Sequence, residues 1–266
     1  MIYICIPSYN EAPTIGLLLW KVRQVFAGFP REYQLLVLDD ASSDATAEVL
    51  ERYTRVLPLT VTRHRERLGY AASIEDLLRQ AVERTDRPKR DAAVLMHADF
   101  AHSPSFIPDL VRRIESGADI VVAEARLEGE PSRTRRLIRR LAPVLLRGAV
   151  TVPGVSDVVS GFAILRLVTL RNAFRSGPTP LLKTDGWAAN AELYDRASRH
   201  ARRVETIAAV ERRDLRQRPS RTGSWDAIVT VWRSRSRLRH LPQYEHLRSP
   251  ANATRGASQQ PEVASS

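Results

Sequence analysis

Residues 95–104 read Leu-Met-His-Ala-Asp-Phe-Ala-His-Ser-Pro and continue an apolar run that begins at Ala92. The run Ala92–Met96 predicts a short buried strand, so Asp99 lies just beyond a strand's carboxyl end, where open α/β sheets bind their ligands. His97 and Asp99 are two residues apart and project from the same side of an extended segment, where they could share a divalent cation. Taken alone, the pair is better explained as a helix cap beside a surface histidine. The choice between a cation site and a helix cap therefore depends on the rest of the chain.

Strand and helix patterns alternate along the first 125 residues. Apolar runs predict five strands, and apolar residues at helical spacing between them predict helices, among them Ile15–Phe26, with Pro13 in its first turn, and Ile74–Val82. The strand runs are 2–6, 35–38, 59–62, 92–96 and 119–123. Such alternation predicts a mostly parallel sheet with helices on both faces. The loops after the first, second and fourth strands then share one edge, which carries Tyr9, Glu11, Asp40, His97 and Asp99.

Motifs of other nucleotide-binding folds do not occur after these strands. No glycine-rich phosphate loop follows any of them, which disfavours the usual dinucleotide fold and an NTPase. Downstream, residues 153–165 predict a turn leading into a strand, residues 187–199 a helix and residues 204–210 a strand.

The composition is that of a globular protein without disulfides. The 266 residues are 43% hydrophobic, which is enough for a sizeable core. Cys5, the single cysteine, lies in the first apolar run and fits a reducing compartment. Pro7 cuts the first apolar run short, and no run approaches the length of a membrane span. We expect a protein that is soluble or lies on a membrane surface.

The net charge of +11 concentrates after residue 130 and favours anionic partners. Between residues 126 and 152, arginines interleave with leucines and predict a cationic amphipathic helix. This helix is either an ordinary surface helix or one that lies on a membrane. The basic half lacks a pattern of aromatic residues interleaved with its arginines and any nucleic-acid-binding module, so we expect no nucleic-acid partner.

Five short segments together point to a family. They are Pro7–Ala12, Val37–Thr46, Arg67–Tyr70, His97–Pro104 and Val155–Phe162. With these segments in this order, over residues 2–232, the chain resembles the family 2 glycosyltransferases of the GT-A fold, and within them the polyprenol-phosphate sugar synthases. The resemblance implies one GT-A domain over 1–232, with a nucleotide-binding half (1–125) and an acceptor-binding half (126–232). Residues 233–266 have too little apolar content to fold and are expected to form a disordered basic tail.

The resemblance assigns the donor site to the early loops. It implies that the base and ribose of a nucleotide-diphosphate sugar are held by Pro7, Tyr9, Glu11 and Asp40, with Asp39, His97 and Ala98 in the same site. Carboxylates accept hydrogen bonds from base N–H and ribose hydroxyl groups, and a tyrosine ring packs on other rings. The alternative for Asp39 and Asp40 is helix capping, and we expect that one of the two serves that purpose.

The same resemblance makes Asp99 the metal-binding acid, with Mn²⁺ or Mg²⁺ on the diphosphate. Here the sequence departs from the family's Asp-x-Asp pattern, because His97 replaces the first acid. Imidazole ligates Mn²⁺ but suits Mg²⁺ poorly, since Mg²⁺ prefers oxygen ligands. Three outcomes follow: Mn²⁺ use with His97 as a ligand, weak metal binding through Asp99 alone, or loss of turnover.

In the polyprenol-phosphate branch the acceptor phosphate is the nucleophile and the product is inverted. The resemblance implies that arginines hold this phosphate, with Arg126, Arg136 and Arg218 as candidates and Arg216 or Arg221 as substitutes for Arg218. The alternative for each is a solvated surface arginine. Asp157, or Glu192, would be a general base if the acceptor were a hydroxyl. The alternative for Asp157 is a hydrogen bond within its own turn. The expected catalytic set is Asp99, Arg126 and Asp157.

The sequence thus predicts an inverting glycosyltransferase that moves a hexose from a donor of the GDP-mannose or UDP-glucose type to a polyprenyl phosphate. We expect it in the cytoplasm, peripheral at the inner membrane face, because Trp225 and Trp232 suit an interface and the chain ends in a polar tail. Two alternatives keep the fold. One is transfer to a sugar or small-molecule hydroxyl, and the other is a non-catalytic binder of nucleotide sugars, motivated by His97.

Overall fold

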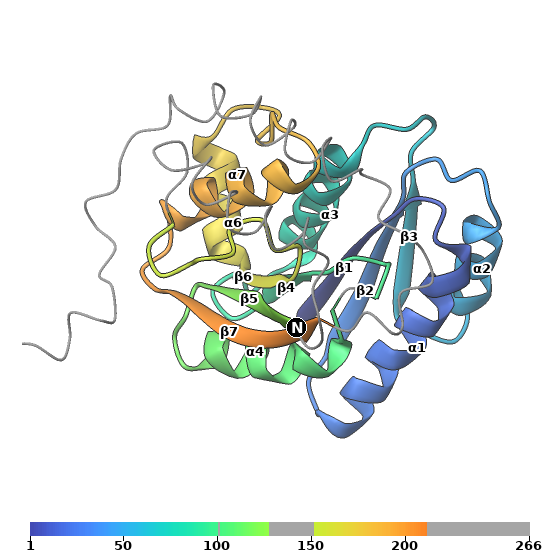
Figure 1. Cartoon of the computed structure of the whole chain (residues 1–266), viewed down its shortest axis with the longest axis horizontal. Helices are drawn as coiled ribbons and strands as arrows, with labels where there is room; N and C mark the ends of the chain where they lie inside the picture. Colours follow the sequence, from blue (N-terminus) through green and yellow to red (C-terminus); the bar gives the residue numbers. More distant parts are fainter. Residues whose placement is uncertain (101, 128–151, 212–266) are drawn as a thin grey trace, which may run out of the picture.

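The computed structural model of the protein describes residues 1–100, 102–127 and 152–211 (Figure 1). Within these ranges, the strands form a single seven-stranded sheet in the order β3-β2-β1-β4-β6-β5-β7. The strands are β1 (Ile2–Ser8), β2 (Tyr33–Asp39), β3 (Leu59–Arg63), β4 (Ala92–Leu95), β5 (Ile120–Leu127), β6 (Ala163–Arg166) and β7 (Val204–Glu211). The helices are α1 (Ala12–Gly28), α2 (Thr46–Thr54), α3 (Tyr70–Arg84), the short 3₁₀ helix η1 (Pro104–Phe106), α4 (Ile107–Glu115), α6 (Leu167–Ser176) and α7 (Trp187–Ser198).

The sheet is mostly parallel, which confirms the sequence prediction. β1 pairs in parallel with β2 and β4, β2 with β3, and β5 with β7. β6 runs antiparallel between β4 and β5. The fifth predicted strand therefore does not lie beside the fourth, because β6 occupies that place. Since β6 starts where β4 ends, residues just before β6 reach the same edge as the loop after β4.

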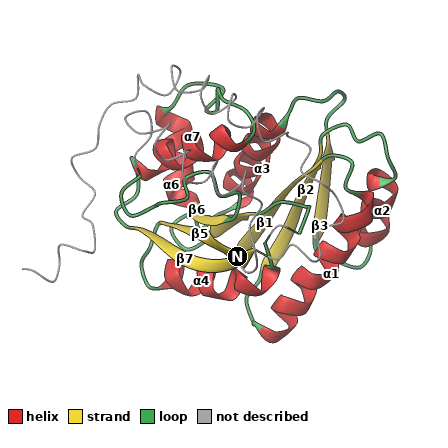
Figure 2. Cartoon of the chain, viewed as in Figure 1, coloured by secondary structure: helices red, strands yellow, loops and turns green. Residues whose placement is uncertain are grey.

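Helices cover both faces of the sheet (Figure 2). Along β1, Ile2, Ile4 and Ile6 face the core formed with α1, α2 and α4, while Tyr3 and Cys5 face the core formed with α3, α6 and α7. This alternation follows from the two-residue period of a strand. β1 has apolar side chains on both faces because both are covered, as expected for a central parallel strand.

The predicted elements that fall within the described residues are present, and one further helix is found. The helices predicted around Ile15–Phe26, Ile74–Val82 and 187–199 correspond to α1, α3 and α7, and Pro13 lies in the first turn of α1. α6 was not predicted, because its apolar stripe is short and interrupted by Arg171 and Asn172. The predicted helix at 126–152, the apolar stripe at 225–232 and the tail lie outside the described residues. Among the helices that the structure describes, none combines the length and hydropathy that a membrane crossing requires.

Adjacent leucines on α1 give a matched test of the core. Leu18 is fully buried, whereas Leu17 is 44% exposed on the same helix. Leu18→Ala should lower the free energy of unfolding by about 2–5 kcal/mol, because it leaves a cavity. Leu17→Ala should change it by less than about 0.5 kcal/mol. Urea denaturation followed by circular dichroism measures both, and equal losses would contradict this packing of α1.

Candidate functional site

A cleft of about 220 Å³ lies at the carboxyl edge of the sheet. Its walls contain many of the residues that the sequence singled out: Pro7, Tyr9, Glu11, Asp40, His97, Ala98 and Asp99. They come from the end of β1 and from the loops after β1, β2 and β4. Parallel neighbours end at the same edge of a sheet, so loops far apart in the chain meet there. The structure thus brings these residues together, although they were identified on separate segments.

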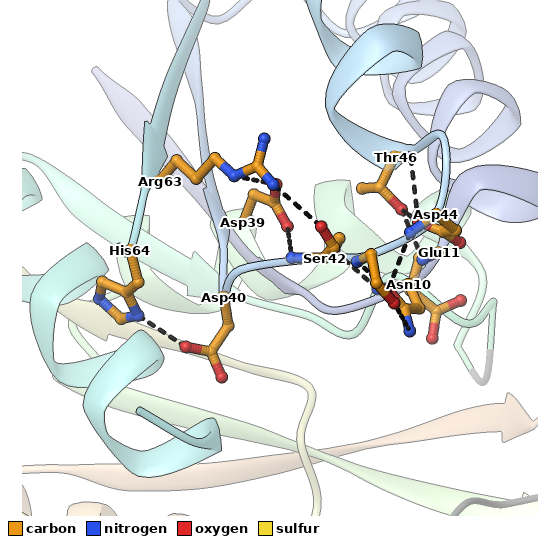
Figure 3. Close-up of polar contacts among 10 residues, drawn as sticks. Asn10, Glu11, Asp39, Asp40, Ser42, Asp44, Thr46, Arg63 and His64 are labelled. Atoms are coloured by element: carbon orange, nitrogen blue, oxygen red, sulfur yellow. Dashed lines mark hydrogen bonds and ion pairs between the residues drawn. The ribbon is translucent and has the colours of Figure 1, made fainter. Parts of the chain in front are cut away.

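The first two loops are fixed to each other by side-chain contacts (Figure 3). Asn10 adopts a positive φ of 52°, which asparagine tolerates better than most residues. Its Oδ1 accepts a hydrogen bond from the Ser43 backbone N–H at 2.7 Å, and its own N–H donates to Ser42 Oγ at 2.8 Å. The Glu11 N–H donates to Thr46 Oγ1 at 2.8 Å. The backbone that presents Tyr9 and Glu11 is therefore held by the loop after β2.

The adjacent acids Asp39 and Asp40 have different surroundings. Asp39 is fully buried and does not line the cleft. Its Oδ1 accepts from the Ser42 N–H at 3.0 Å, and Arg63 Nε lies 3.3 Å from its Oδ2. Asp39 therefore holds the turn behind the cleft, outside the wall that the other predicted donor-site residues form. The expectation that one of the two acids caps a helix is wrong, because neither α2 nor α3 has a side-chain cap.

Asp40 faces the cleft and joins the end of β2 to the loop between β3 and α3. Its Oδ1 accepts from the Leu68 N–H at 2.8 Å and lies 2.7 Å from His64 Nδ1, while its Oδ2 accepts from the Gly69 N–H at 2.9 Å. These contacts place the loop after β3, and that loop carries Arg67 into the cleft wall. The Arg67 guanidinium lies 4.2 Å from the centroid of the Tyr9 ring, a cation–π arrangement. A cation and an aromatic ring thus line one wall of the cleft.

His97 packs flat against Tyr70, with ring centroids 5.1 Å apart and an interplanar angle of 13°. The Tyr70 hydroxyl donates to Asn190 Oδ1 at 2.9 Å and lies 3.4 Å from His97 Nε2, and the Asn190 amide donates to the Val159 carbonyl. Because the hydroxyl gives its proton to Asn190, it can only accept from Nε2. The contact is a hydrogen bond in the tautomer of His97 that carries its proton on Nε2.

Burial raises the pKa of the Tyr70 hydroxyl above its usual value. The hydrogen bond with Asn190 acts in the opposite direction, and the nearby charges of Asp99 and Asp185 raise the pKa further. Tyr70 therefore stays protonated at neutral pH and serves as a hydrogen-bonding neighbour of His97 rather than as a base.

Gly161 makes room for the His97 ring. A Cβ atom at Gly161 would lie 1.9 Å from His97 Nε2, far inside contact distance. Gly161 precedes β6, so the antiparallel strand delivers this glycine to the loop after β4. The sequence grouped the two segments by resemblance but did not indicate that one accommodates the other.

The residues present fit a divalent cation only in part. His97 and Asp99 both line the cleft, so an imidazole and a carboxylate are both present to ligate a cation there. Among residues 1–100, 102–127 and 152–211, no group of three or more histidine, cysteine or acidic side chains forms a metal site. One carboxylate and one imidazole can hold a cation that takes its other ligands from a diphosphate.

The backbone at the site is strained after each of the three loop-bearing strands. Besides Asn10, positive φ angles occur at Ala41 (56°) and at Phe100 (59°), directly after Asp40 and Asp99. These are all the non-glycine residues with positive φ in the part of the chain that the structure describes. Such backbone outliers cost free energy and cluster at ligand sites. Here each one turns the chain immediately beside a side chain of the cleft.

Asp157 and Glu192, the two acids considered as general bases, do not line the cleft. Asp157 does not line the cleft, and its backbone N–H donates to Glu124 Oε1 at 3.3 Å while its carbonyl accepts from the Ser160 N–H at 3.2 Å. Glu192 is 2% exposed and accepts from the backbone N–H groups of Lys183 and Thr184 and from the Arg196 guanidinium. Both carboxylate oxygens of Glu192 are thus buried and bound within the protein, so Glu192 cannot serve as a general base.

The arginines predicted for the acceptor phosphate are not described at the level of side chains. The backbone of Arg126 lies in β5, paired with Val210 of β7. The side chain of Arg126 lies outside the described residues, as do Arg136 and Arg218 with the substitutes Arg216 and Arg221.

Several cleft residues were not assigned to the site from the sequence: Ser8, Arg67, Tyr70, Ser73, Gly186 and Trp187. Trp187 is the first residue of α7 and directly follows Gly186, which has a φ of 59°. Asp185 accepts a hydrogen bond from the Ala71 N–H at 3.1 Å and so ties the start of α7 to the start of α3. The Gly-Trp pair at a helix start was a usable signal, but nothing in its spacing indicated that α7 meets α3.

Comparison with known proteins gives one family match. The sequence model of Glycosyl transferase family 2 matches residues 3–174. The dolichol-phosphate mannosyltransferase of Pyrococcus furiosus is 27% identical over 168 residues, covering 61% of this chain and 45% of that protein. The undecaprenyl-phosphate 4-deoxy-4-formamido-L-arabinose transferase of Pseudomonas fluorescens is 30% identical over 120 residues, covering 44% and 33%. The chain thus spans less than half the length of these curated relatives.

Solved structures share the fold. A mannosyltransferase from Pyrobaculum calidifontis, in complex with GDP-Man and Mn²⁺, gives a TM-score of 0.57 at 20% identity over 88% of this chain and 60% of that one. Glucosyl-3-phosphoglycerate synthase from Mycobacterium tuberculosis, in complex with UDP, gives a TM-score of 0.58 at 20% identity over 91% and 81%. These likenesses, with the family match, confirm the predicted GT-A fold.

The close approach of His97 to Gly161 is testable by a double-mutant cycle. Gly161→Ala should lower the free energy of unfolding by about 1–3 kcal/mol, because the new methyl group overlaps the imidazole. In a His97→Ala background the same substitution should cost little, since the space is then open. Gly28→Ala, where a Cβ would meet nothing within 4 Å, is the control. Equal costs in both backgrounds would contradict the contact.

Proposed function

The chain belongs to glycosyltransferase family 2, and on that premise we propose that it moves a hexose from a nucleotide-diphosphate sugar to a polyprenyl phosphate at a membrane surface. The observation that carries the proposal is the meeting of Tyr9, Glu11, Asp40 and Asp99 in one cleft. Two relatives bear names that specify polyprenyl-phosphate acceptors, dolichol phosphate in one and undecaprenyl phosphate in the other. The proposal extends that acceptor class to this chain.

The donor site is assigned by chemistry. Asp40 presents a carboxylate already oriented by backbone N–H groups, so its remaining acceptor capacity suits a base N–H. Glu11, whose Oε2 accepts from Thr14 Oγ1 at 2.8 Å, suits a ribose hydroxyl. Tyr9 and Arg67 offer a ring and a cation to the nucleotide. We assign the donor class as nucleotide-diphosphate hexose, of the GDP-mannose or UDP-glucose type.

The reaction is a displacement at the anomeric carbon with inversion. An oxygen of the acceptor phosphate forms the new bond to that carbon, and the bond to the nucleoside diphosphate breaks. The acceptor phosphate is already anionic, so the chain need not supply a base. His97 and Asp99 would hold a divalent cation, Mn²⁺ or Mg²⁺, that neutralises charge on the departing diphosphate. Arg126, Arg136 and Arg218 remain the proposed ligands of the acceptor phosphate.

A transfer assay tests the proposal directly. Purified protein is incubated with labelled GDP-mannose or UDP-glucose, a polyprenyl phosphate and Mn²⁺ or Mg²⁺, and organic-extractable label is counted. Asp99→Asn should reduce transfer on the order of 100-fold or more, because charge stabilisation of the leaving group is lost. The control is Asp109→Asn, an exposed acid on α4, which should leave transfer unchanged. Nucleotide binding without transfer under either metal would instead support a binder, and label in a water-soluble product a hydroxyl acceptor.

The metal preference of the site tests the role of His97. His97→Asp restores two acids in the Asp-x-Asp spacing, so the ratio of activity with Mg²⁺ to activity with Mn²⁺ should rise at least several-fold. Metal titrations of transfer, together with calorimetric titration of each metal in the presence of nucleoside diphosphate, measure the change. An unchanged metal profile would remove His97 from the metal site.

A further inference from the structure

His64 does not line the cleft, but its ring lies between two carboxylates, one of which, Asp40, does. It directly follows β3, and its side chain is 9% exposed. Nδ1 lies 2.7 Å from Asp40 Oδ1, and Nε2 lies 3.0 Å from Asp76 Oδ2 on α3 (Figure 3 shows the Asp40 contact). The His64 backbone N–H donates to the Asp39 carbonyl at 3.0 Å, so the backbone that carries the ring is held at the end of β2.

We propose that His64 is a positioning residue of the donor site: as an imidazolium it holds Asp40, and with it the loop at residues 65–69, in the arrangement that receives the nucleotide. This inference rests on the proposed function, because it assumes that Asp40 contacts the donor. It adds a group that does not itself touch the ligand, and it predicts that donor affinity depends on the charge of that group.

The need for a charged ring follows from its partners. An ionised carboxylate only accepts hydrogen bonds, so both ring nitrogens must carry protons for both contacts to form. A neutral imidazole has one N–H and would leave a nitrogen lone pair facing a carboxylate. The charged groups that act on the ring are Asp40 from the end of β2 and Asp76 from α3. The neighbouring arginines point elsewhere: Arg63 pairs with Asp39, and Arg67 lies over Tyr9.

The protonation equilibrium agrees with this geometry. Burial is the largest influence on the His64 pKa and lowers it, but the hydrogen bonds to Asp40 and Asp76 and the charges of both acids outweigh it, so the pKa lies above its ordinary value of 6.5. The folded protein therefore binds this proton more tightly than the unfolded chain does. The resulting stabilisation is complete below about pH 6.5 and is lost as pH rises through the raised pKa.

The consequence for the cleft passes through Asp40. Its carboxylate accepts from His64 and from the N–H groups of Leu68 and Gly69, so three protein donors fix its orientation. When His64 loses its charge, one charge-assisted hydrogen bond becomes neutral or breaks, and the buried acid loses its counter-ion. The loop that carries Arg67 is then held less firmly. Nucleoside diphosphate affinity should fall about 5-fold over this transition, the difference between a charged and a neutral hydrogen bond.

The test combines two readouts on the full chain between about pH 5.5 and 9. Calorimetry measures the dissociation constants of UDP and GDP, each with Mn²⁺. Nuclear magnetic resonance follows the His64 ring protons and the amide signals of Leu68 and Gly69 in the ligand-free protein. In the wild type, the ring, the two amides and the nucleotide affinity should titrate with one common midpoint above 6.5.

Asp76→Asn is the discriminating variant, because Asp76 does not line the cleft and its side chain is half exposed. Removing this charge should lower all the midpoints together. His64→Gln should weaken nucleotide binding about 5-fold at pH 6 and flatten the profile. Asp86→Asn, an acid whose side chain is 84% exposed, is the matched control and should leave every midpoint unchanged.

The outcomes separate this inference from the proposed function. If nucleotide binds but the Leu68 and Gly69 amides do not titrate with His64, or if Asp76→Asn leaves the midpoint of binding unchanged, the positioning role is wrong. If the amides titrate with His64 and respond to Asp76→Asn, yet neither UDP nor GDP binds at any pH, the positioning of Asp40 stands and the proposed function is wrong.

Discussion

The Asp40 carboxylate is the contact on which the site depends. It lies at the end of β2 and accepts hydrogen bonds from the backbone of Leu68 and Gly69, and its partner His64 follows β3. A carboxylate this buried is stable only when donors surround it. Because those donors belong to the loop after β3, satisfying Asp40 also determines where that loop and Arg67 lie. The requirement of one buried charge thus organises one side of the cleft.

The opposite side depends on the direction of β6. Inserted antiparallel between β4 and β5, β6 begins at the edge where β4 ends. Gly161 and the residues before it therefore meet His97, and α7 brings Asn190 to the hydroxyl of Tyr70. A parallel β6 would have carried the same residues to the far edge of the sheet. The mixed topology is what completes the wall around His97.

The packing on these two sides of the cleft explains how a histidine can occupy the position where family 2 enzymes have an acid. The His97 ring stacks on Tyr70 and fits over Gly161, which has no Cβ. The Tyr70 hydroxyl is in turn held by Asn190, whose amide donates to the Val159 carbonyl. These contacts fix the orientation of the ring, a feature that metal-binding histidines need. Three other segments of the chain therefore accommodate the histidine at this position, through Tyr70, Gly161 and Asn190.

The residue pattern was enough to predict the alternation of strands and helices, the mostly parallel sheet and the edge at which Tyr9, Glu11, Asp40 and Asp99 meet. These follow from local periodicity and from the rule that parallel strands end together, so they need no knowledge of distant contacts. The family was identified separately, by the resemblance of five short segments in a fixed order. Three features could be seen only in the folded chain. Asp39 turns behind the cleft while Asp40 faces it, Glu192 is buried with its carboxylate bound to backbone N–H groups, and His64, Tyr70 and Trp187 belong to or support the site. Each of these depends on which distant backbone N–H or side chain satisfies a buried polar group, and that pairing is a property of the packed chain rather than of residue spacing.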